Sequence, residues 1–456
     1  MPPQIALLFC CVFVVYLLAL DRKLYPRASA VLWLPTIWML SIATRSLDVW
    51  FNVGGLDHES GGIYDPLFQA GALCCGVIIL LRRNFDWSAF FRTNTALTVL
   101  LAYMLLSVAW SDSPFITFKR WTRELTAVAM ALLAVSELSP RQSLECLLRR
   151  TTYILIPFSI VLVKYYPYLG VTFGRWSGEV QWIGVTLQKN GLGRLCMVCV
   201  FYLVWARMLR RRKEGVVAGK YQNLCEWLVL GMTLWLLRGP SMWAASATAI
   251  YSLCAGMITF LGLSWLRKRN IRWAPGIWVA AVAGILTFGI ITPILGGSTV
   301  TGFTSAVGRD ASLTGRTDIW AGLLPDVMRH PMLGYGVSSF WTPTRTIEHD
   351  IGEAHNGYLE TCLGLGALGV AITCMFILSA VRKAAQLLDR DYGWASLVLC
   401  FLLMIAVHNI TESSYDSFGR HLMALCLFFS VCMDPLLRQA RVAQFRSPPL
   451  LRIPAA

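Results

Sequence analysis

The stretch EAHNGYLETCLGLGALG, from Glu353 to Gly369, places a histidine beside a glutamate just before an apolar run. An imidazole titrates near neutral pH, so His355 could act as a general base, and Glu353 could orient it. The positive end of the helix that follows should disfavour imidazolium and keep the ring neutral. Asn356 has the side chain of a helix cap, which accepts hydrogen bonds from backbone N–H groups. We therefore predict that Asn356 caps the helix, that His355 does chemistry, and that Glu353 and Asn356 also contribute to substrate binding; the alternative is a histidine that only caps or packs.

A second candidate, Arg316, stands in GRTDIW just ahead of a predicted helix. The apolar residues of TDIWAGLLPDVMRH recur at helical spacing and share one face, which could lie on a membrane surface: Ile319, Trp320, Leu323, Leu324 and Val327. Backbone N–H groups at a helix start bind anions, and an arginine matches phosphate oxygens with two hydrogen bonds. Arg316 with Lys189 or Arg175 would therefore make a clamp for a diphosphate; the alternative for each is a solvated loop charge.

The elements that carry these residues are predicted to cross a membrane. The chain is 56% hydrophobic and only 14% charged, with a mean hydropathy of +0.58, whereas soluble proteins carry about a quarter charged residues. A spanning helix needs roughly 20 apolar residues, and about thirteen segments approach that length, with twelve as the alternative. We predict an all-α, polytopic integral membrane protein that forms one domain over 1–456, and an N-terminal segment that is not a cleaved signal peptide. The predicted spans are 4–20, 28–44, 65–81, 95–110, 124–138, 151–166, 190–209, 224–237, 245–265, 273–295, 357–381, 394–410 and 420–434.

The net charge of +15 follows the predicted topology rather than a nucleic-acid surface. Lysines and arginines cluster in every second connection, which is the positive-inside pattern. The N-terminus is then outside and the C-terminus inside. The basic clusters include Arg22, Lys23 and Arg27, Arg141, Arg149 and Arg150, the RRRK of 210–213, the RKRNIR of 267–272, and Arg382, Lys383 and Arg390. The connections that should face outward are 45–64, 111–123, 167–189, 238–244, 296–356 and 411–419.

Two of these outward connections are long enough to carry function. Segment 296–356 has about sixty residues where most connections have a handful, and loops of that length are usually functional. It is rich in Gly, Asp, Arg, Ser and Thr and contains Arg316 and His355. We predict that 296–356 is the extracytoplasmic catalytic loop and that 167–189, with Arg175 and Lys189, is a second functional loop.

The GLGALG of 364–369 fits a dinucleotide-binding pattern but follows no strand and lies in an apolar helix. Small residues at this spacing let membrane helices approach closely, so we interpret it as a helix-packing surface.

Three blocks in order, LTGRTDIW, HPMLGYGVSSF and AHNGYLETCLGLGALG, together resemble the signature of the O-antigen ligase and polymerase superfamily. These are bacterial membrane glycan transferases, and some members polymerise exopolysaccharide. The blocks cover about 312–370, and WSDSP and LQKNGLG extend the likeness toward the rest of the chain. Arg316 matches the arginine of the family's Gly-Arg block and His355 its histidine. Lys189 or Arg175 could match a further basic residue near the seventh span.

The resemblance implies a glycosyltransferase of the bacterial inner membrane with its active site on the periplasmic side. It implies a polyprenyl-diphosphate-linked glycan as donor, a glycan or lipid hydroxyl as acceptor, and transfer with inversion. Neither metal nor cofactor is expected, because the diphosphate is already a leaving group. The alternative is a flippase for the same lipid or another polysaccharide transporter, although we find no repeated halves and few acidic residues in the spans. Ligase and polymerase share these motifs; the wording of GRTDIW and HNGYLE leans toward the exopolysaccharide polymerases.

Overall fold

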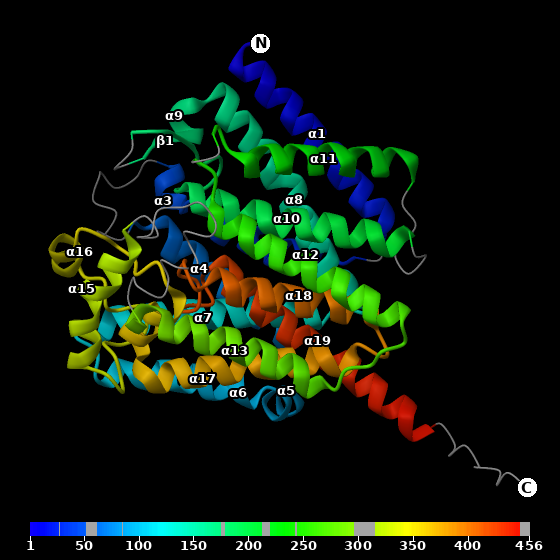
Figure 1. The fold of residues 1–456 in the computed structure, drawn as a ribbon. Coiled ribbons are helices and arrows are strands. Elements are labelled where there is room, and N and C mark those ends of the chain that lie inside the picture. Colours follow the sequence, from blue (N-terminus) through cyan, green and yellow to red (C-terminus); the bar gives the residue numbers. More distant parts are fainter. Residues whose placement is uncertain are drawn as a thin grey trace, which may run out of the picture.

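The computed structural model describes residues 1–26, 28–51, 62–83, 85–174, 178–211, 219–241, 244–295 and 315–446, with side chains up to residue 435. The long helices pack side by side with their axes roughly aligned, and several of the short elements gather at one end of the bundle (Figure 1). Within the described residues the only sheet is the antiparallel pair β1 (Val171–Phe173) and β2 (Val180–Trp182). The prediction of an all-α polytopic membrane protein is confirmed.

The helices follow the chain in this order: α1 (Pro3–Leu24), η1 (Ala30–Leu32), α2 (Trp33–Ala43), α3 (Leu47–Trp50), α4 (Tyr64–Arg82), α5 (Trp87–Thr93), α6 (Thr95–Leu106), η2 (Ser107–Ala109), α7 (Pro114–Val135), α8 (Pro140–Tyr165), α9 (Pro167–Gly170), α10 (Lys189–Arg211), α11 (Lys220–Arg238), α12 (Ala247–Lys268), α13 (Pro275–Leu295), α15 (Arg316–Arg329), α16 (Pro343–His349), α17 (Gly357–Leu387), α18 (Tyr392–His408) and α19 (His421–Arg446).

Each predicted span falls on a helix, but fewer of these helices qualify as spans by length and composition. In the described part of the chain seven do, namely α1, α4, α8, α10, α12, α13 and α17. The pair α5 and α6, bent by 92° at its break, adds an eighth if it counts as one span. Helix α7 begins with charged residues, and α18 has only 17 residues. Twelve or thirteen spans therefore stay a prediction.

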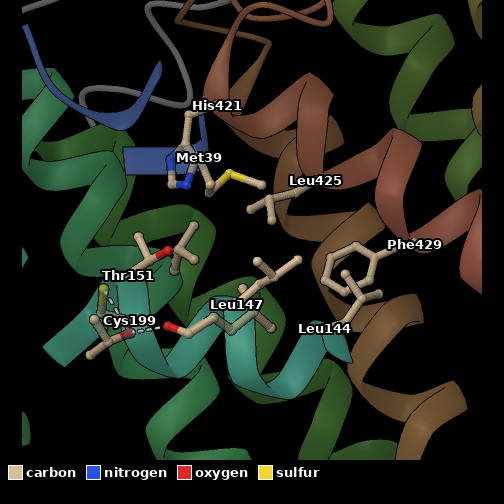
Figure 2. A pocket seen from close by; sticks show the side chains of 11 residues that line it. Met39, Leu144, Leu147, Thr151, Cys199, His421, Leu425 and Phe429 are labelled. Atoms are coloured by element: carbon tan, nitrogen blue, oxygen red, sulfur yellow. Dashed lines mark hydrogen bonds between the residues drawn. The ribbon is translucent and has the colours of Figure 1, made fainter. Parts of the chain in front are cut away.

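Helix α18 forms the centre of the bundle. It packs against α10, α12, α13, α17 and α19, and all of its residues except Val407 are buried. A helix that is apolar all round is expected to be covered on every side. The described core also holds a small cavity near His421, lined by Met39, Leu147, Thr151 and other side chains (Figure 2). The volume open to the centre of a water molecule is about 10 Å³. The cavity therefore has room for about one water and not for a lipid chain.

The connections that we predicted to face outward contact one another at one end of the bundle. Arg345 of α16 pairs with Asp112, at 2.8 Å between Nη2 and Oδ2. Arg45, just after α2, donates its backbone N–H to the carbonyl oxygen of Val185 at 3.1 Å. Figure 1 shows α3, α9, β1, α15 and α16 together at this end.

The connections that we predicted to face inward also contact one another. Arg150 of α8 lies 2.8 Å from Asp21 of α1, and Arg141 lies 3.0 Å from Asp391, just before α18. The alternation of ends along the chain therefore agrees with the positive-inside pattern. Which end faces out of the cytoplasm stays a prediction.

Gly364 and Gly366 of GLGALG contact a loop rather than a neighbouring helix, so our interpretation of them as a helix-packing surface is wrong at these two positions. Gly366 interrupts α17 with φ +66°, and a Cβ there would lie 2.2 Å from the carbonyl carbon of Met332. Gly336 donates its N–H to the carbonyl oxygen of Gly364 at 2.8 Å. The glycines thus let the 331–337 backbone dock on α17, which fixes the region between α15 and α16 to the bundle.

Candidate active site around Glu412

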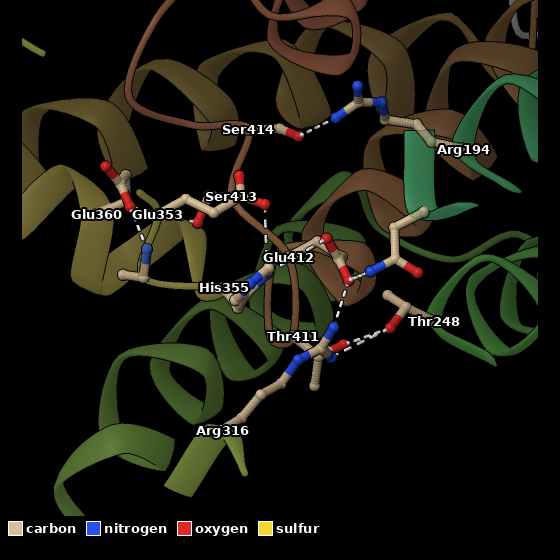
Figure 3. A network of polar contacts seen from close by, with 12 residues as sticks. Arg194, Thr248, Arg316, Glu353, His355, Glu360, Thr411, Glu412, Ser413 and Ser414 are labelled. Carbon is tan, nitrogen blue, oxygen red and sulfur yellow. Dashed lines mark hydrogen bonds and ion pairs between the residues drawn. The ribbon is translucent and has the colours of Figure 1, made fainter. Parts of the chain in front are cut away.

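Three side chains from distant parts of the sequence meet at the carboxylate of Glu412 (Figure 3). Its Oε1 accepts hydrogen bonds from Arg316 Nη2 at 2.5 Å and from Asn190 Nδ2 at 2.7 Å. Its Oε2 lies 3.9 Å from Nδ1 of His355. Arg316 begins α15, Asn190 lies in the first turn of α10, and His355 precedes α17. Glu412, in the connection between α18 and α19, is only 5% exposed, so this network is shielded from solvent.

The backbone that carries His355 has an unusual conformation. His355 has φ +49°, a left-handed value that few residues other than glycine adopt. Asn356, the next residue, accepts hydrogen bonds from the N–H groups of Tyr358 and Leu359 at 3.0 and 2.8 Å. The prediction that Asn356 caps the helix is therefore confirmed, and His355 is not needed for capping.

Asn356 has no free polar atom to offer a substrate. Its Nδ2 donates to the carbonyl oxygens of Gly289 and Ile410 at 3.3 and 2.9 Å, and its side chain is fully buried. Both donors and both acceptor positions of the amide are thus in use. We assign it the role of positioning His355 in place of the substrate contact that we expected.

Glu360, in the first turn of α17, holds the other side of this backbone. Its carboxylate accepts hydrogen bonds from the N–H of Ala354 at 2.7 Å and from Nε1 of Trp341 at 2.5 Å. Ser413 Oγ lies 3.5 Å from the same group. Glu360 therefore ties the residue before His355 to the connection that contains Glu412.

Glu353 lies beside His355 as predicted, with 3.4 Å between its Oε1 and Nδ1 of the imidazole. Burial lowers the pKa of the His355 imidazole, but the carboxylates of Glu412 and Glu353 outweigh burial and raise that pKa above its ordinary value. The expected lowering of the imidazole pKa by the helix start is therefore not found, because the two neighbouring carboxylates have the larger effect on that pKa.

Glu412 remains ionised in this network. Burial alone would raise the pKa of its carboxyl group, but the guanidinium of Arg316 and the imidazole of His355 hold that pKa well below its usual range. A fixed negative charge therefore sits between the arginine and the histidine.

Arg316 begins a helix as predicted, and the apolar face of that helix is buried in protein. Trp320 and Leu323 of α15 pack with Phe340 and Leu359 in a cluster of their own. The membrane-surface interpretation of this face is thus replaced by packing against the start of α17. The Arg316 side chain is 13% exposed and also lies 3.5 Å from Thr248 Oγ1 of α12.

A further basic group, Arg194, lies beside this network, and sequence reasoning missed it. Arg175 lies outside the described residues. Lys189 begins α10, next to Asn190, whereas Arg194 lies one helical turn after Asn190 and reaches Ser414 Oγ at 3.5 Å (Figure 3). Positions i and i+4 share a helix face. That spacing in the KNGLGR stretch was the available signal.

The connection between α18 and α19 supplies half of the site. Besides Glu412 it carries Arg420, whose Nε lies 2.8 Å from Asp416 and whose Nη1 lies 3.6 Å from Glu353. Glu124 of α7 holds this connection by accepting hydrogen bonds from Ser417 Oγ and the N–H of Phe418, both at 2.6 Å. Three guanidinium groups, of Arg194, Arg316 and Arg420, are therefore gathered here.

Glu353, His355 and Glu412 also have the side-chain types of a metal site, with ligand atoms within 4.8 Å of one another. However, Glu412 is paired with Arg316, and Glu353 lies 3.6 Å from Arg420. A cation would have to displace these guanidinium groups, so we keep the prediction that the site works without a metal.

Comparisons with known proteins agree with the sequence motifs. Residues 232–374 match the family model described as O-antigen ligase, a region that includes Arg316 and His355. The chain is also similar to the exopolysaccharide production protein ExoQ of Rhizobium meliloti (strain 1021), with 22% identity over 314 residues, which cover 65% of this chain and 67% of that protein. The resemblance to the O-antigen ligase and polymerase superfamily is confirmed.

Proposed function

We propose that this multi-pass membrane protein, similar to the O-antigen ligases, moves a glycan from a polyprenyl-diphosphate carrier to an acceptor hydroxyl. Transfer takes place at the periplasmic face of the bacterial inner membrane, inverts the anomeric centre and uses no metal. The observation that carries the proposal is the convergence of Arg316, Arg194 and His355 around Glu412 at one end of the bundle. Cations for a diphosphate and a base for a hydroxyl are thereby placed side by side.

The arginines stabilise the leaving group. The diphosphate of the donor binds Arg316 and Arg194 while its prenyl chain stays in the bilayer. As the bond between the anomeric carbon and the phosphate oxygen breaks, its electron pair passes to that oxygen. Guanidinium groups fixed beside the growing negative charge lower the barrier without needing to reorganise. The product is a prenyl diphosphate that remains in the membrane.

His355 activates the acceptor. The neutral imidazole takes the proton of the acceptor hydroxyl as the oxygen attacks the anomeric carbon from the face opposite the leaving group. A positioned base of this kind contributes typically about 100- to 10,000-fold. The carboxylates of Glu353 and Glu412 stabilise the imidazolium that results, and the proton then leaves to solvent.

The remaining predicted residues have supporting roles in this proposal. The catalytic unit is the 296–356 connection, of which residues 315–356 are described. The 167–189 connection leads into α10 and so places Lys189 close to the donor's path. We assign the principal second cation to Arg194, with Lys189 or Arg175 contacting the outer phosphate or the glycan.

Polymerisation is the form of transfer that we favour, with a second lipid-linked glycan as acceptor. The similarity to a protein of exopolysaccharide production supports this choice over transfer to a lipid A core. A flippase or other polysaccharide transporter is the rival function. A transporter normally carries ionisable groups midway through the membrane. The gathering of Arg316, His355 and Glu412 beyond the helix ends supports a transferase instead.

The test is transfer in proteoliposomes containing the full chain and a purified lipid-linked glycan. Arg316→Ala should lower transfer by about 100-fold or more, because an electrostatic group aimed at the leaving group is lost. Arg329→Ala, at the other end of α15 and largely exposed, is the matched control and should transfer normally. Equal activity of the two variants would rule out the proposed role of the arginine. Movement of the lipid across the bilayer without glycan transfer would identify a flippase.

A further inference from the structure

Arg316 is already paired with a carboxylate, so it is not an open anion site in this structure. Its guanidinium and the carboxylate of Glu412 are 2.5 Å apart, and the two side chains are only 13% and 7% exposed. A diphosphate that binds Arg316 must therefore replace Glu412 or approach against its negative charge. The like charges of a carboxylate and a phosphate repel strongly in such a shielded setting.

Glu412 has a second cationic partner within reach. Its Oε2 lies 3.9 Å from Nδ1 of His355, about 1 Å beyond an ordinary N–H to oxygen hydrogen bond. That nitrogen is buried and has no hydrogen-bond partner among the described residues. A small movement of the carboxylate away from Arg316 would therefore satisfy an imidazole N–H that the resting arrangement leaves unsatisfied.

We propose that Glu412 is a latch that holds Arg316 in the resting enzyme, and that the donor's diphosphate releases it toward His355. This inference rests on the proposed function and concerns the regulation of the same site. Donor binding thereby couples the two halves of the chemistry: His355, which already lies 3.4 Å from Glu353, gains Glu412 as a hydrogen-bonded carboxylate partner only when the leaving group is in place.

The surroundings of Glu412 allow this exchange. Asn190 keeps its hydrogen bond to Oε1 at 2.7 Å, which tethers the carboxylate while Arg316 leaves. The other titratable groups near the pair are Glu353 ahead of α17, His408 at the end of α18, and Arg194 from α10, which itself interacts with Asp416 and Arg420 of the same connection.

The latch predicts that removing the charge of Glu412 separates binding from turnover. In Glu412→Gln the amide retains an acceptor for Asn190, but Arg316 loses its competitor and His355 its partner. A lipid diphosphate should then bind more tightly, by roughly 3- to 30-fold, as expected for the loss of one close like charge. Turnover should fall, and the acid limb of the rate should move to lower pH. A merely structural role would weaken binding and turnover together.

Binding is measured with farnesyl diphosphate, a prenyl diphosphate that carries no glycan, on the full chain in nanodiscs. Wild type is compared with Glu412→Gln, Arg316→Ala and the double variant. The tighter binding of farnesyl diphosphate in Glu412→Gln should be absent from the double variant, because the double-mutant cycle isolates the interaction between Arg316 and Glu412. Glu124→Gln is the matched control, since Glu124 anchors the same connection and no ion pair to a basic side chain appears for it in the described structure. It should not tighten binding.

The outcomes separate the latch from the proposed function. If Arg316→Ala binds farnesyl diphosphate as well as wild type does, the proposed anion site itself is wrong. If Arg316→Ala weakens binding but Glu412→Gln weakens it too, the anion site stands and the latch is wrong. If Glu412→Gln does not insert, Glu412→Asp replaces it. The shorter side chain keeps the charge but cannot hold Arg316 as closely, so it should tighten binding by a smaller factor, and weaker binding would contradict the latch.

Discussion

Arg316 and Glu412 form an ion pair across 96 positions of sequence, from the start of α15 to the connection between α18 and α19. The pair joins the long 296–356 connection to the last connection of the bundle. Because Glu412 also faces His355, an anion-binding group and a candidate base belong to one network.

Arg316→Lys should recover little of the activity that Arg316→Ala loses. Lysine keeps the charge but has no planar fork to bind two phosphate oxygens, and its ammonium group cannot satisfy Glu412 and Thr248 as the guanidinium does. Transfer in proteoliposomes should stay at least about tenfold below wild type. Full activity of the lysine variant would show that a point charge is sufficient.

The rate of glycan transfer should fall on acidification, and the midpoint of this fall should lie above the ordinary pKa of histidine. The base acts only when the imidazole is neutral, and the carboxylates beside His355 raise its pKa, so acidification removes the active form early. In Glu353→Gln one of these charges is gone, so the acid limb of kcat/KM should move to lower pH. Asp112→Asn, which removes an acid paired with Arg345 instead, is the control and should leave the limb in place. An unchanged limb in Glu353→Gln would contradict the assigned base.

Arg194→Ala should impair transfer more than Lys189→Ala. Arg194 faces the connection that carries Glu412 and reaches Ser414, whereas Lys189 lies at the first position of the helix. We expect a rise in the donor KM of roughly tenfold for Arg194→Ala, in line with the loss of a charged hydrogen bond to phosphate. Initial rates over a range of donor concentrations measure it. A larger effect of Lys189→Ala than of Arg194→Ala would identify Lys189 as the second cation of the site.

The site should be reachable from outside the cytoplasm. Ile347 of α16 is 80% exposed, so a single cysteine there should react with an impermeant thiol reagent on intact spheroplasts. The variant is made in a chain whose native cysteines are replaced. A cysteine at Lys220, at the start of α11, should react only after the membrane is opened. The reverse pattern would invert the topology that the positive-inside rule predicts.

Local chemistry in the sequence was enough to predict some of this site. Asn356 caps a helix because an amide follows a bend and precedes an apolar run, and Arg316 begins a helix because the apolar spacing starts there. Local spacing puts Arg194 on the same helix face as Asn190, but it does not show that Arg194 and Glu412 meet at one site. Their role depends on which helix ends meet, and that depends on how α10, α17 and α18 pack, which no local pattern specifies.

His355→Gln tests whether the histidine is a base or part of the structure. Because Asn356 already caps α17 and Glu360 holds the N–H of Ala354, the loss of the imidazole should leave the fold intact. Glutamine is similar in size and can donate a hydrogen bond to Glu412 or Glu353, but it cannot take a proton. Transfer should therefore fall by about two to four orders of magnitude, as far as in His355→Ala, while both variants bind farnesyl diphosphate, since the phosphate contacts belong to Arg316 and Arg194. The measurements are transfer in proteoliposomes, binding in nanodiscs and thermal unfolding. A glutamine variant with near-normal transfer would make His355 a structural residue, and a loss of folding in both variants would place its main contribution in the left-handed turn before α17.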